Sequence, residues 1–216
     1  MSLIDEILFI SERECSICKE NESKSFGICE DCLERLDIIN ELYFNSELEI
    51  EVNSILFYNR FAKSIIRRFK FLSEPYLYNS LGELMFFYAD KNNFLRNIDL
   101  IMPVPLHKDR KKARGYNQSE LLAKKISELS GIKICIDAAV KVKNTPEQNK
   151  LNYERRKRNL KNSIKIIDKN IVGKDILIID DFITTGETIK SLYNPLKDMG
   201  IKSAKALVLS SGKTYY

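Results

Sequence analysis

The sequence predicts an α/β fold, a parallel sheet flanked by helices, with a small cysteine-rich module in front of it. Three observations support this prediction. Short aliphatic runs alternate with helical patterns along most of the chain, as they do in parallel α/β sheets. Four of the five cysteines lie within residues 15–32. The length of 216 residues allows one full domain and an appendage, and we expect a module over residues 1–50 and a domain over 51–216.

The cysteines of the front module form two pairs, with two residues between the members of each: Cys15 with Cys18, and Cys29 with Cys32. Two such knuckles can present four thiolates tetrahedrally around one Zn²⁺. Disulfides are the competing interpretation, but the cytoplasm in which we expect this chain is reducing. Because four thiolates leave no open coordination position, we predict a zinc ribbon with a structural Zn²⁺. An apolar stripe upstream is expected to dock the module on the body: Leu3, Ile4, Ile7 and Leu8.

The first elements of the body follow directly. Residues 33–48 are expected to form a helix and the segment that leaves it, and a short strand is expected over 53–58. Apolar residues at helical spacing predict a helix over 61–69 that ends in basic residues. A second helix is expected after Pro75, with apolar residues along one face.

The second half of the chain continues the alternation. A buried strand is expected over 98–104, stopped by two prolines, and a helix over 117–129. Pro195 lies inside the last helical pattern and should kink or shorten that helix. Further strands are expected at 132–136, 138–142, 164–167, 175–180 and 204–209.

Charge is distributed unevenly along the chain. Residues 1–51 contain 4 Lys and Arg against 14 Asp and Glu, whereas residues 103–165 contain 17 against 6. Solvated surface is the ordinary explanation for charged stretches. The contrast nevertheless favours a middle region that faces an anion, either a phosphate-bearing small molecule or a nucleic acid.

The sequence offers no membrane segment. Its longest unbroken apolar run, residues 84–89, is far shorter than the roughly 20 residues that a membrane span needs. The first residues carry acids and no basic region of the kind that begins a signal peptide. We therefore expect a cytoplasmic protein with no membrane insertion.

The most informative stretch is residues 176–188. An apolar strand ends in Asp180 and Asp181, and a turn of small residues then opens a helix, which is where ligands bind in open α/β sheets. Backbone N–H groups at that helix start form an anion site, and hydroxyls and a glycine complete the turn: Thr184, Thr185, Gly186, Glu187 and Thr188. Adjacent carboxylates suit vicinal hydroxyls or a bridging Mg²⁺. The stretch predicts a site for a ribose 5′-phosphate, with a plain strand-to-helix turn as the alternative.

Several stretches carry a resemblance to known proteins. Residues 176–188 resemble the signature with which type I phosphoribosyltransferases bind phosphoribosyl pyrophosphate (PRPP). The run Met-Pro-Val-Pro-Leu-His at 102–107 and the run from Arg110 to Ala123 resemble a motif of the ComF family, competence proteins for DNA uptake that include ComFC and GntX-like members. A loop from Thr145 to Leu160 and the paired cysteines also resemble that family's pattern. Together these stretches cover nearly the whole chain in the right order.

The resemblance implies a type I phosphoribosyltransferase-like fold and a role for each motif. The turn 184–188 would hold the 5′-phosphate of PRPP, and Asp180 and Asp181 would hold the ribose hydroxyls with Mg²⁺. Arg114 and the backbone of Gly115 would clamp the pyrophosphate, a task that suits a guanidinium because it binds phosphate oxygens bidentately. Asp181 and Arg114 are the candidate catalytic residues.

Three functions remain open at this point. The chain is a PRPP-binding protein of DNA uptake and natural transformation, or an active phosphoribosyltransferase with an unknown acceptor and no DNA role, or an adaptor for other competence proteins built on its acidic front module. The basic residues 155–158 beside Tyr153 suit single-stranded DNA, whose bases would stack on Tyr116 or Tyr153. The alternative is a solvated lid over PRPP. Nothing in the candidate hood, residues 141–163, indicates a base-specific pocket.

Overall fold

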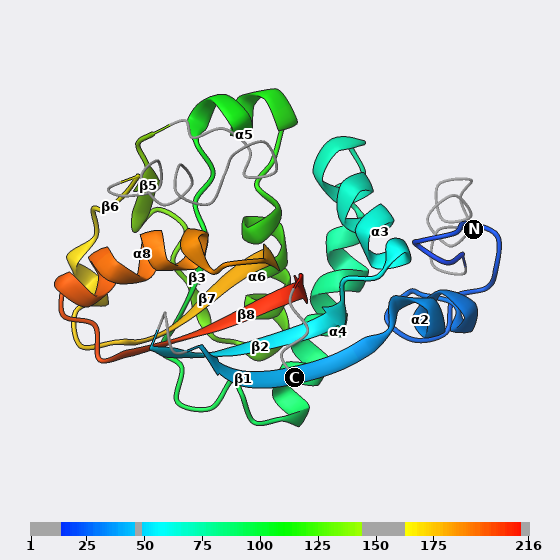
Figure 1. The fold of residues 1–216 in the computed structure, drawn as a ribbon, viewed down its shortest axis with the longest axis horizontal. Coiled ribbons are helices and arrows are strands. Elements are labelled where there is room, and N and C mark those ends of the chain that lie inside the picture. Colours follow the sequence, from blue (N-terminus) through cyan, green and yellow to red (C-terminus); the bar gives the residue numbers. More distant parts are fainter. Residues whose placement is uncertain (1–13, 46–48, 144–162, 213–216) are drawn as a thin grey trace, which may run out of the picture.

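A six-stranded sheet forms the centre of the computed structural model, which describes residues 14–45, 49–143 and 163–212 (Figure 1). The strand order is β1-β2-β8-β7-β3-β4, and every neighbouring pair is parallel except the antiparallel pair of β1 and β2. The strands are β1 (Ile38–Asn45), β2 (Ile50–Phe57), β3 (Leu100–Pro103), β4 (Lys133–Ile134), β7 (Asp175–Ile183) and β8 (Ser203–Ser211). This arrangement confirms the predicted fold class.

Helices cover both faces of the sheet because its central strands are apolar on both sides. In β7, Leu177 and Ile179 pack with α3, α4 and α6, whereas Ile176 and Ile178 pack with α8 on the other face. This alternation follows from the period of two along a strand. The helices are α2 (Glu30–Leu36), α3 (Arg60–Phe71), α4 (Leu77–Lys91), α5 (Lys108–Arg114), α6 (Gln118–Ser130), α8 (Glu187–Asp198) and the 3₁₀ turn η2 (Lys169–Ile171).

The connections reverse direction between β3 and β7. The chain leaves β3 through α5 and α6 to reach β4, and it leaves β7 through α8 to reach β8 on the opposite side. α6 and α8 lie on opposite faces of the sheet (Figure 1). The gap beyond the carboxyl ends of β3 and β7 is therefore a topological switch point, the usual ligand position in open α/β sheets.

A second, two-stranded antiparallel sheet consists of β5 (Ala139–Lys141) and β6 (Ile164–Ile166). It packs on the α8 face through Ala139 and Ile164. β5 lies at the start of the segment that the sequence suggested as a hood. The two short strands thus bring the beginning of that segment close to the main sheet.

The prediction for residues 33–48 was wrong in part. α2 ends at Leu36, and Asp37 adopts a left-handed conformation (φ 53°) that stops the helix. The next residues form β1 instead, since β-branched and aromatic residues favour a sheet surface. β1 lies before residue 50 and pairs with β2, and the division of the chain at that residue stays a prediction.

The other elements lie close to their predicted positions, with three additions. β7 runs on to Ile183, so that the acid pair lies within the strand, and α5 and η2 form where no helix was expected. Pro195 lies inside α8, which continues past it to Asp198, so the predicted shortening is wrong and the kink stays a prediction. Two predicted features lie outside the described residues: the apolar stripe at Leu3, Ile4, Ile7 and Leu8, and the loop 145–160 with Tyr153, Arg155, Arg156, Lys157 and Arg158.

None of the helices in the described part of the chain combines the length and apolar character that crossing a bilayer requires.

Candidate functional site

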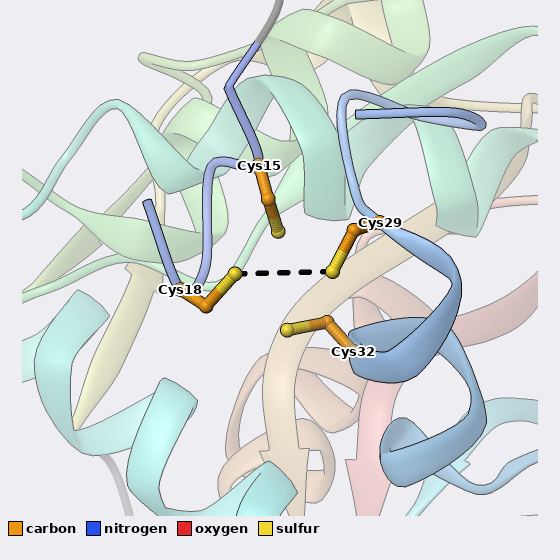
Figure 2. A group of neighbouring side chains, drawn as sticks. All are labelled: Cys15, Cys18, Cys29 and Cys32. Carbon is orange, nitrogen blue, oxygen red and sulfur yellow. Dashed lines mark hydrogen bonds between the residues drawn. The ribbon is translucent and has the colours of Figure 1, made fainter. Parts of the chain in front are cut away.

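The four predicted zinc ligands converge in one cluster (Figure 2). Their sulfur atoms all lie within 4.8 Å of one another, and the Sγ atoms of Cys18 and Cys29 are 3.8 Å apart. Four sulfurs bound at about 2.3 Å to a tetrahedral Zn²⁺ would be separated by about 3.8 Å, so the spacing fits this metal. The cysteines are unbridged, and Cys15, Cys29 and Cys32 are buried. The cluster could therefore hold a metal ion.

Backbone hydrogen bonds favour the thiolate form of Cys15. Burial acts to raise the pKa of the Cys15 thiol, but N–H groups of Cys18, Cys29 and Ile17 hydrogen-bond its sulfur and bring the pKa down to about 6. Burial raises the pKa of both Cys29 and Cys32. Metal binding has to displace those protons, as at other thiolate sites.

The acid pair on β7 is buried and held by specific partners. The Asp180 Oδ1 atom accepts hydrogen bonds from the Ser119 hydroxyl of α6 (2.9 Å) and from the N–H of Asp181 (3.0 Å). The Lys70 Nζ of α3 lies 2.9 Å from Oδ2 of Asp181. Each carboxylate is thus oriented by a different helix at the switch point of the sheet.

Burial and repulsion from the Asp181 carboxylate raise the pKa of Asp180 to about 7, although Lys70 and the Ser119 hydroxyl act in the opposite direction. A buried carboxyl with such a shift, in a cavity and beside a second carboxylate, is typical of a functional site. The side chain is therefore better suited to a ligand than to the stability of the fold.

This pKa shift predicts a pH-dependent cost to stability. Between the ordinary pKa near 3.8 and the folded-state pKa of about 7, the unfolded chain binds fewer protons than the folded one, so the free energy of unfolding falls as pH rises through this window. We expect Asp180→Asn to raise the thermal midpoint more at pH 8 than at pH 5. Thermal unfolding of both proteins at the two pH values tests this, and parallel pH profiles would contradict it.

The turn after β7 has the features of an anion site. Gly186 is the N-cap of α8 with φ 77°, a conformation that favours glycine. The first N–H groups of this 12-residue helix point toward the turn, where an anion would complement the helix dipole. Among the residues that the structure describes, the Thr185 hydroxyl is buried and has no hydrogen-bond partner.

These groups open into a cavity of about 430 Å³ beyond the carboxyl ends of β2, β3 and β7. Its charged lining contains six basic and three acidic side chains, so it favours an anion. They are Lys63, Arg67 and Lys70 from α3, Arg110 and Arg114 from α5, Lys141 from β5, and Asp180, Asp181 and Glu187. Thr184, Gly186 and Thr188 of the predicted turn line it as well.

The region expected to clamp a pyrophosphate is a short helix. His107 caps α5 by accepting a hydrogen bond from the Asp109 N–H, and Gly115 ends the helix with φ 85°. The Arg114 guanidinium lines the cavity and lies 5.0 Å from the centre of the Phe71 ring. The N–H of Gly115 donates to the Lys111 carbonyl within α5. Gly115 and Thr185 are not among the residues that line the cavity.

Five basic residues of the cavity were not among the predicted site residues: Lys63, Arg67, Lys70, Arg110 and Lys141. Lys63, Arg67 and Lys70 are spaced four and three apart, so they share one face of α3, a signal that the sequence contained. Lys141 had no such signal, because only the fold brings β5 to this edge. Burial, and then repulsion from Arg110, lower the pKa of Lys141. The sequence therefore predicted the acidic and hydroxyl part of the site better than its basic part.

A switch-point cavity with an acid pair, a hydroxyl-rich helix start and a basic lining defines the chain as an α/β protein with a site suited to a phosphorylated ligand. It is similar to competence protein F of Haemophilus influenzae, with 28% identity over 197 residues, 87% of this chain and 86% of the relative. ComFC of Bacillus subtilis is 27% identical over 86% of this chain and 72% of the relative. The resemblance to the ComF family is confirmed, and the chain is a homologue of these competence proteins.

The DNA utilization protein YhgH of Escherichia coli K12 is 30% identical over 148 residues, 67% of this chain and 65% of the relative. None of the protein-family models matches the chain. Purine phosphoribosyltransferase of Pyrococcus horikoshii superposes with a TM-score of 0.40 at 19% identity, over 61% of this chain and 73% of that one. UMP synthase of Leishmania donovani also reaches 0.40, at 18% identity over 65% and 24%. Such scores are too low to argue from, and the fold class rests on the strand order itself.

Proposed function

We propose that the chain binds PRPP together with Mg²⁺ in the switch-point cavity and acts in DNA uptake for natural transformation, in the cytoplasm. The single observation that carries the PRPP site is the convergence of the acid pair, the α8 start and the basic side chains in one cavity. Its volume of about 430 Å³ is in the ordinary range for small-molecule sites. The names of the relatives, which refer to competence and DNA utilization, support the biological role.

Each part of PRPP has a chemically suitable partner. The N–H groups at the start of α8 and the hydroxyls of Thr184 and Thr188 suit the 5′-phosphate. The carboxylates of Asp180 and Asp181 suit the ribose hydroxyls. Arg110 and Arg114 line the cavity from α5, where their guanidinium groups suit the pyrophosphate. The proposed role of the buried Thr185 hydroxyl requires a rearrangement that opens it to the ligand. The proposed role of the Gly115 N–H requires it to leave the Lys111 carbonyl.

The acid pair also fits a magnesium ion. Mg²⁺ prefers oxygen ligands and binds through one or two carboxylates together with substrate phosphates. The buried Asp180 and Asp181 supply such oxygens, and Lys70 now occupies the position of a cation beside Asp181. When bound, the ion would neutralise charge on the diphosphate of PRPP.

Calorimetry with PRPP in the presence and absence of Mg²⁺ tests this proposal directly. We expect saturable binding of one PRPP per chain that is stronger with Mg²⁺. Absence of binding by metal-replete, folded protein would overturn it. Ribose 5-phosphate as a second ligand separates the contribution of the α8 turn from that of the pyrophosphate.

Active phosphoribosyl transfer with an unknown acceptor and no DNA role is the second candidate. In such a reaction the bond from the anomeric carbon to the pyrophosphate oxygen breaks, and a bond from the acceptor to that carbon forms. The basic side chains of α3 and α5 favour it, because they would stabilise charge that develops on the departing pyrophosphate. Arg114 would act there, and Asp181 would position the ribose. Pyrophosphate release that depends on an added acceptor, without any DNA-binding activity, would favour this candidate.

Binding of single-stranded DNA is the second half of the proposal. The basic residues 155–158 lie outside the described residues, but they are close in sequence to β5, which contributes Lys141 to the cavity. Binding through several phosphates should weaken as salt rises. A plot of the logarithm of the binding constant against the logarithm of the salt concentration should have a slope of about −0.7 per phosphate contacted. Changing Arg155, Arg156 and Arg158 together to Ala should make the slope shallower by about two units. Fluorescence anisotropy over a salt series measures this. No affinity even at low salt would leave the loop as a lid over PRPP.

A further inference from the structure

We propose that Arg68 is a positioning residue that couples the cysteine cluster to the basic lining of the cavity, so that metal occupancy and PRPP affinity depend on each other. This coupling rests on the proposed function, because its test measures PRPP binding. Arg68 lies in α3 next to Arg67 but serves a different side of the helix. Arg67 lines the cavity, whereas Arg68 reaches the segment between two of the cysteines.

Every nitrogen of the Arg68 guanidinium is used in this arrangement. Nη1 donates to the carbonyl of Ile17, between Cys15 and Cys18, at 2.8 Å. Nε and Nη2 donate to the Glu74 carboxylate at 3.0 and 2.6 Å. The Tyr76 hydroxyl donates to the same carboxylate at 2.6 Å. Because a two-pronged arginine–carboxylate pair is geometrically specific and Arg68 and Glu74 are mostly buried, this pair is more than a loose surface contact.

The same turn of α3 is fixed to the cavity on its other side. The Phe69 carbonyl accepts hydrogen bonds from the Tyr116 hydroxyl (2.5 Å) and from the Gln118 side-chain amide (3.3 Å), in the segment just after Arg114. Lys70, two residues after Arg68, is the partner of Asp181. The last turn of α3 therefore lies between the cysteine cluster and the proposed ligand groups.

Packing makes this connection stiff. Cys15, Ile17 and Cys32 belong to the same continuous apolar core as Phe69 of α3 and Leu81 of α4. A closely packed core does not deform continuously, so a change in the cysteine cluster has to be accommodated by α3 as a unit. When the cluster loses its metal and loosens, the Ile17 carbonyl is no longer held in place for Arg68. Lys63, Arg67 and Lys70 then lose their fixed positions in the cavity.

Coupling between two binding sites is reciprocal, and this yields two independent measurements. By calorimetry with PRPP and Mg²⁺, Arg68→Met should weaken PRPP binding by about 5- to 10-fold, within the range typical of coupled sites. Equilibrium competition with a chelator measures the zinc affinity. In the parent protein, saturating PRPP should raise the zinc affinity, and zinc should raise the PRPP affinity by the same factor. Arg68→Met should remove this effect of PRPP on zinc affinity.

Control variants separate coupling from general destabilisation. Lys24→Met removes an ion pair of the same region, with Glu30 at 2.6 Å, that lies on the surface and does not reach α3. It should leave PRPP affinity unchanged. Glu74→Gln is a milder variant that keeps Arg68 in place but weakens its carboxylate partner, and it should give a smaller loss. If thermal unfolding shows that Arg68→Met does not fold, the PRPP affinity of Glu74→Gln tests the coupling instead.

The outcomes distinguish this inference from the proposed function. If the parent protein binds no PRPP, the proposed function fails and the coupling fails with it. If the parent binds PRPP and both Arg68→Met and Glu74→Gln bind it equally well, the proposed function stands and the coupling is wrong. An effect of PRPP on zinc affinity that persists unchanged in a folded Arg68→Met protein would also overturn it.

Discussion

Replacing Asp180 and Asp181 together by asparagine is expected to abolish PRPP binding while the protein remains folded. Both carboxylates lie in the cavity, and a hydrogen bond to a charged group contributes about 1.5–3 kcal/mol. Loss of two such groups should therefore weaken binding by more than about 100-fold. The fold should survive because an asparagine oxygen can still accept from the Ser119 hydroxyl and from the backbone N–H of residue 181. Calorimetry with PRPP and Mg²⁺ measures the change.

Asp175 provides the matched control, since it lies at the other end of the same strand. Its carboxylate accepts hydrogen bonds from Lys202 and Ser203, far from the carboxyl ends where the cavity lies. Asp175→Asn should therefore leave PRPP affinity unchanged, whatever it does to stability. A double Asn variant at 180 and 181 that binds PRPP as tightly as the parent would show that these two side chains are not the ribose ligands.

Local patterns were sufficient to predict most of the fold. The strands β7 and β8 are apolar runs that are buried on both faces, and the helices α3 and α4 have an apolar stripe, so each pattern had one consistent interpretation. β1 was missed because its residues follow a helix without a proline or glycine to mark the change. α5 was missed because it is short, basic and without a buried side chain, which leaves no apolar periodicity to detect.

The candidate site was predictable only where its residues are neighbours in sequence. Asp180, Asp181 and the turn up to Thr188 form one continuous segment, and the four cysteines form another. Lys70 and Lys141 enter the site from distant elements, and the relation between them depends on the strand order and on the small second sheet. The role proposed for Arg68 could not be predicted at all, since it depends on contact with a residue 51 positions away.

Cys32→Ser is expected to cause loss of the metal and local unfolding of the cysteine cluster. A structural Zn²⁺ stabilises a small site by about 10 kcal/mol or more in zinc-finger peptides, and serine is a much poorer ligand than a thiolate. The zinc content measured by elemental analysis should fall from one zinc per chain to well below one. Hydrogen exchange should become fast in residues 15–36, while the sheet stays protected because β7 and β8 have their own core on both faces.

The shared core limits how local this unfolding can be. Leu36, Ile28 and the buried cysteines pack in the same cluster as α3 and α4, so we expect partial loss of protection in the last turn of α3 as well. Cys135→Ser is the matched control, because this half-buried cysteine lies outside the cluster and should change neither zinc content nor exchange near Cys32. The zinc ribbon would be ruled out if elemental analysis finds no zinc in parent protein prepared with sufficient metal. Disulfides among the four cysteines would also rule it out. Unchanged protection of α3 in Cys32→Ser would show that the front module and the cavity are independent, because the carbonyl of Ile17 would then not be needed to hold Arg68.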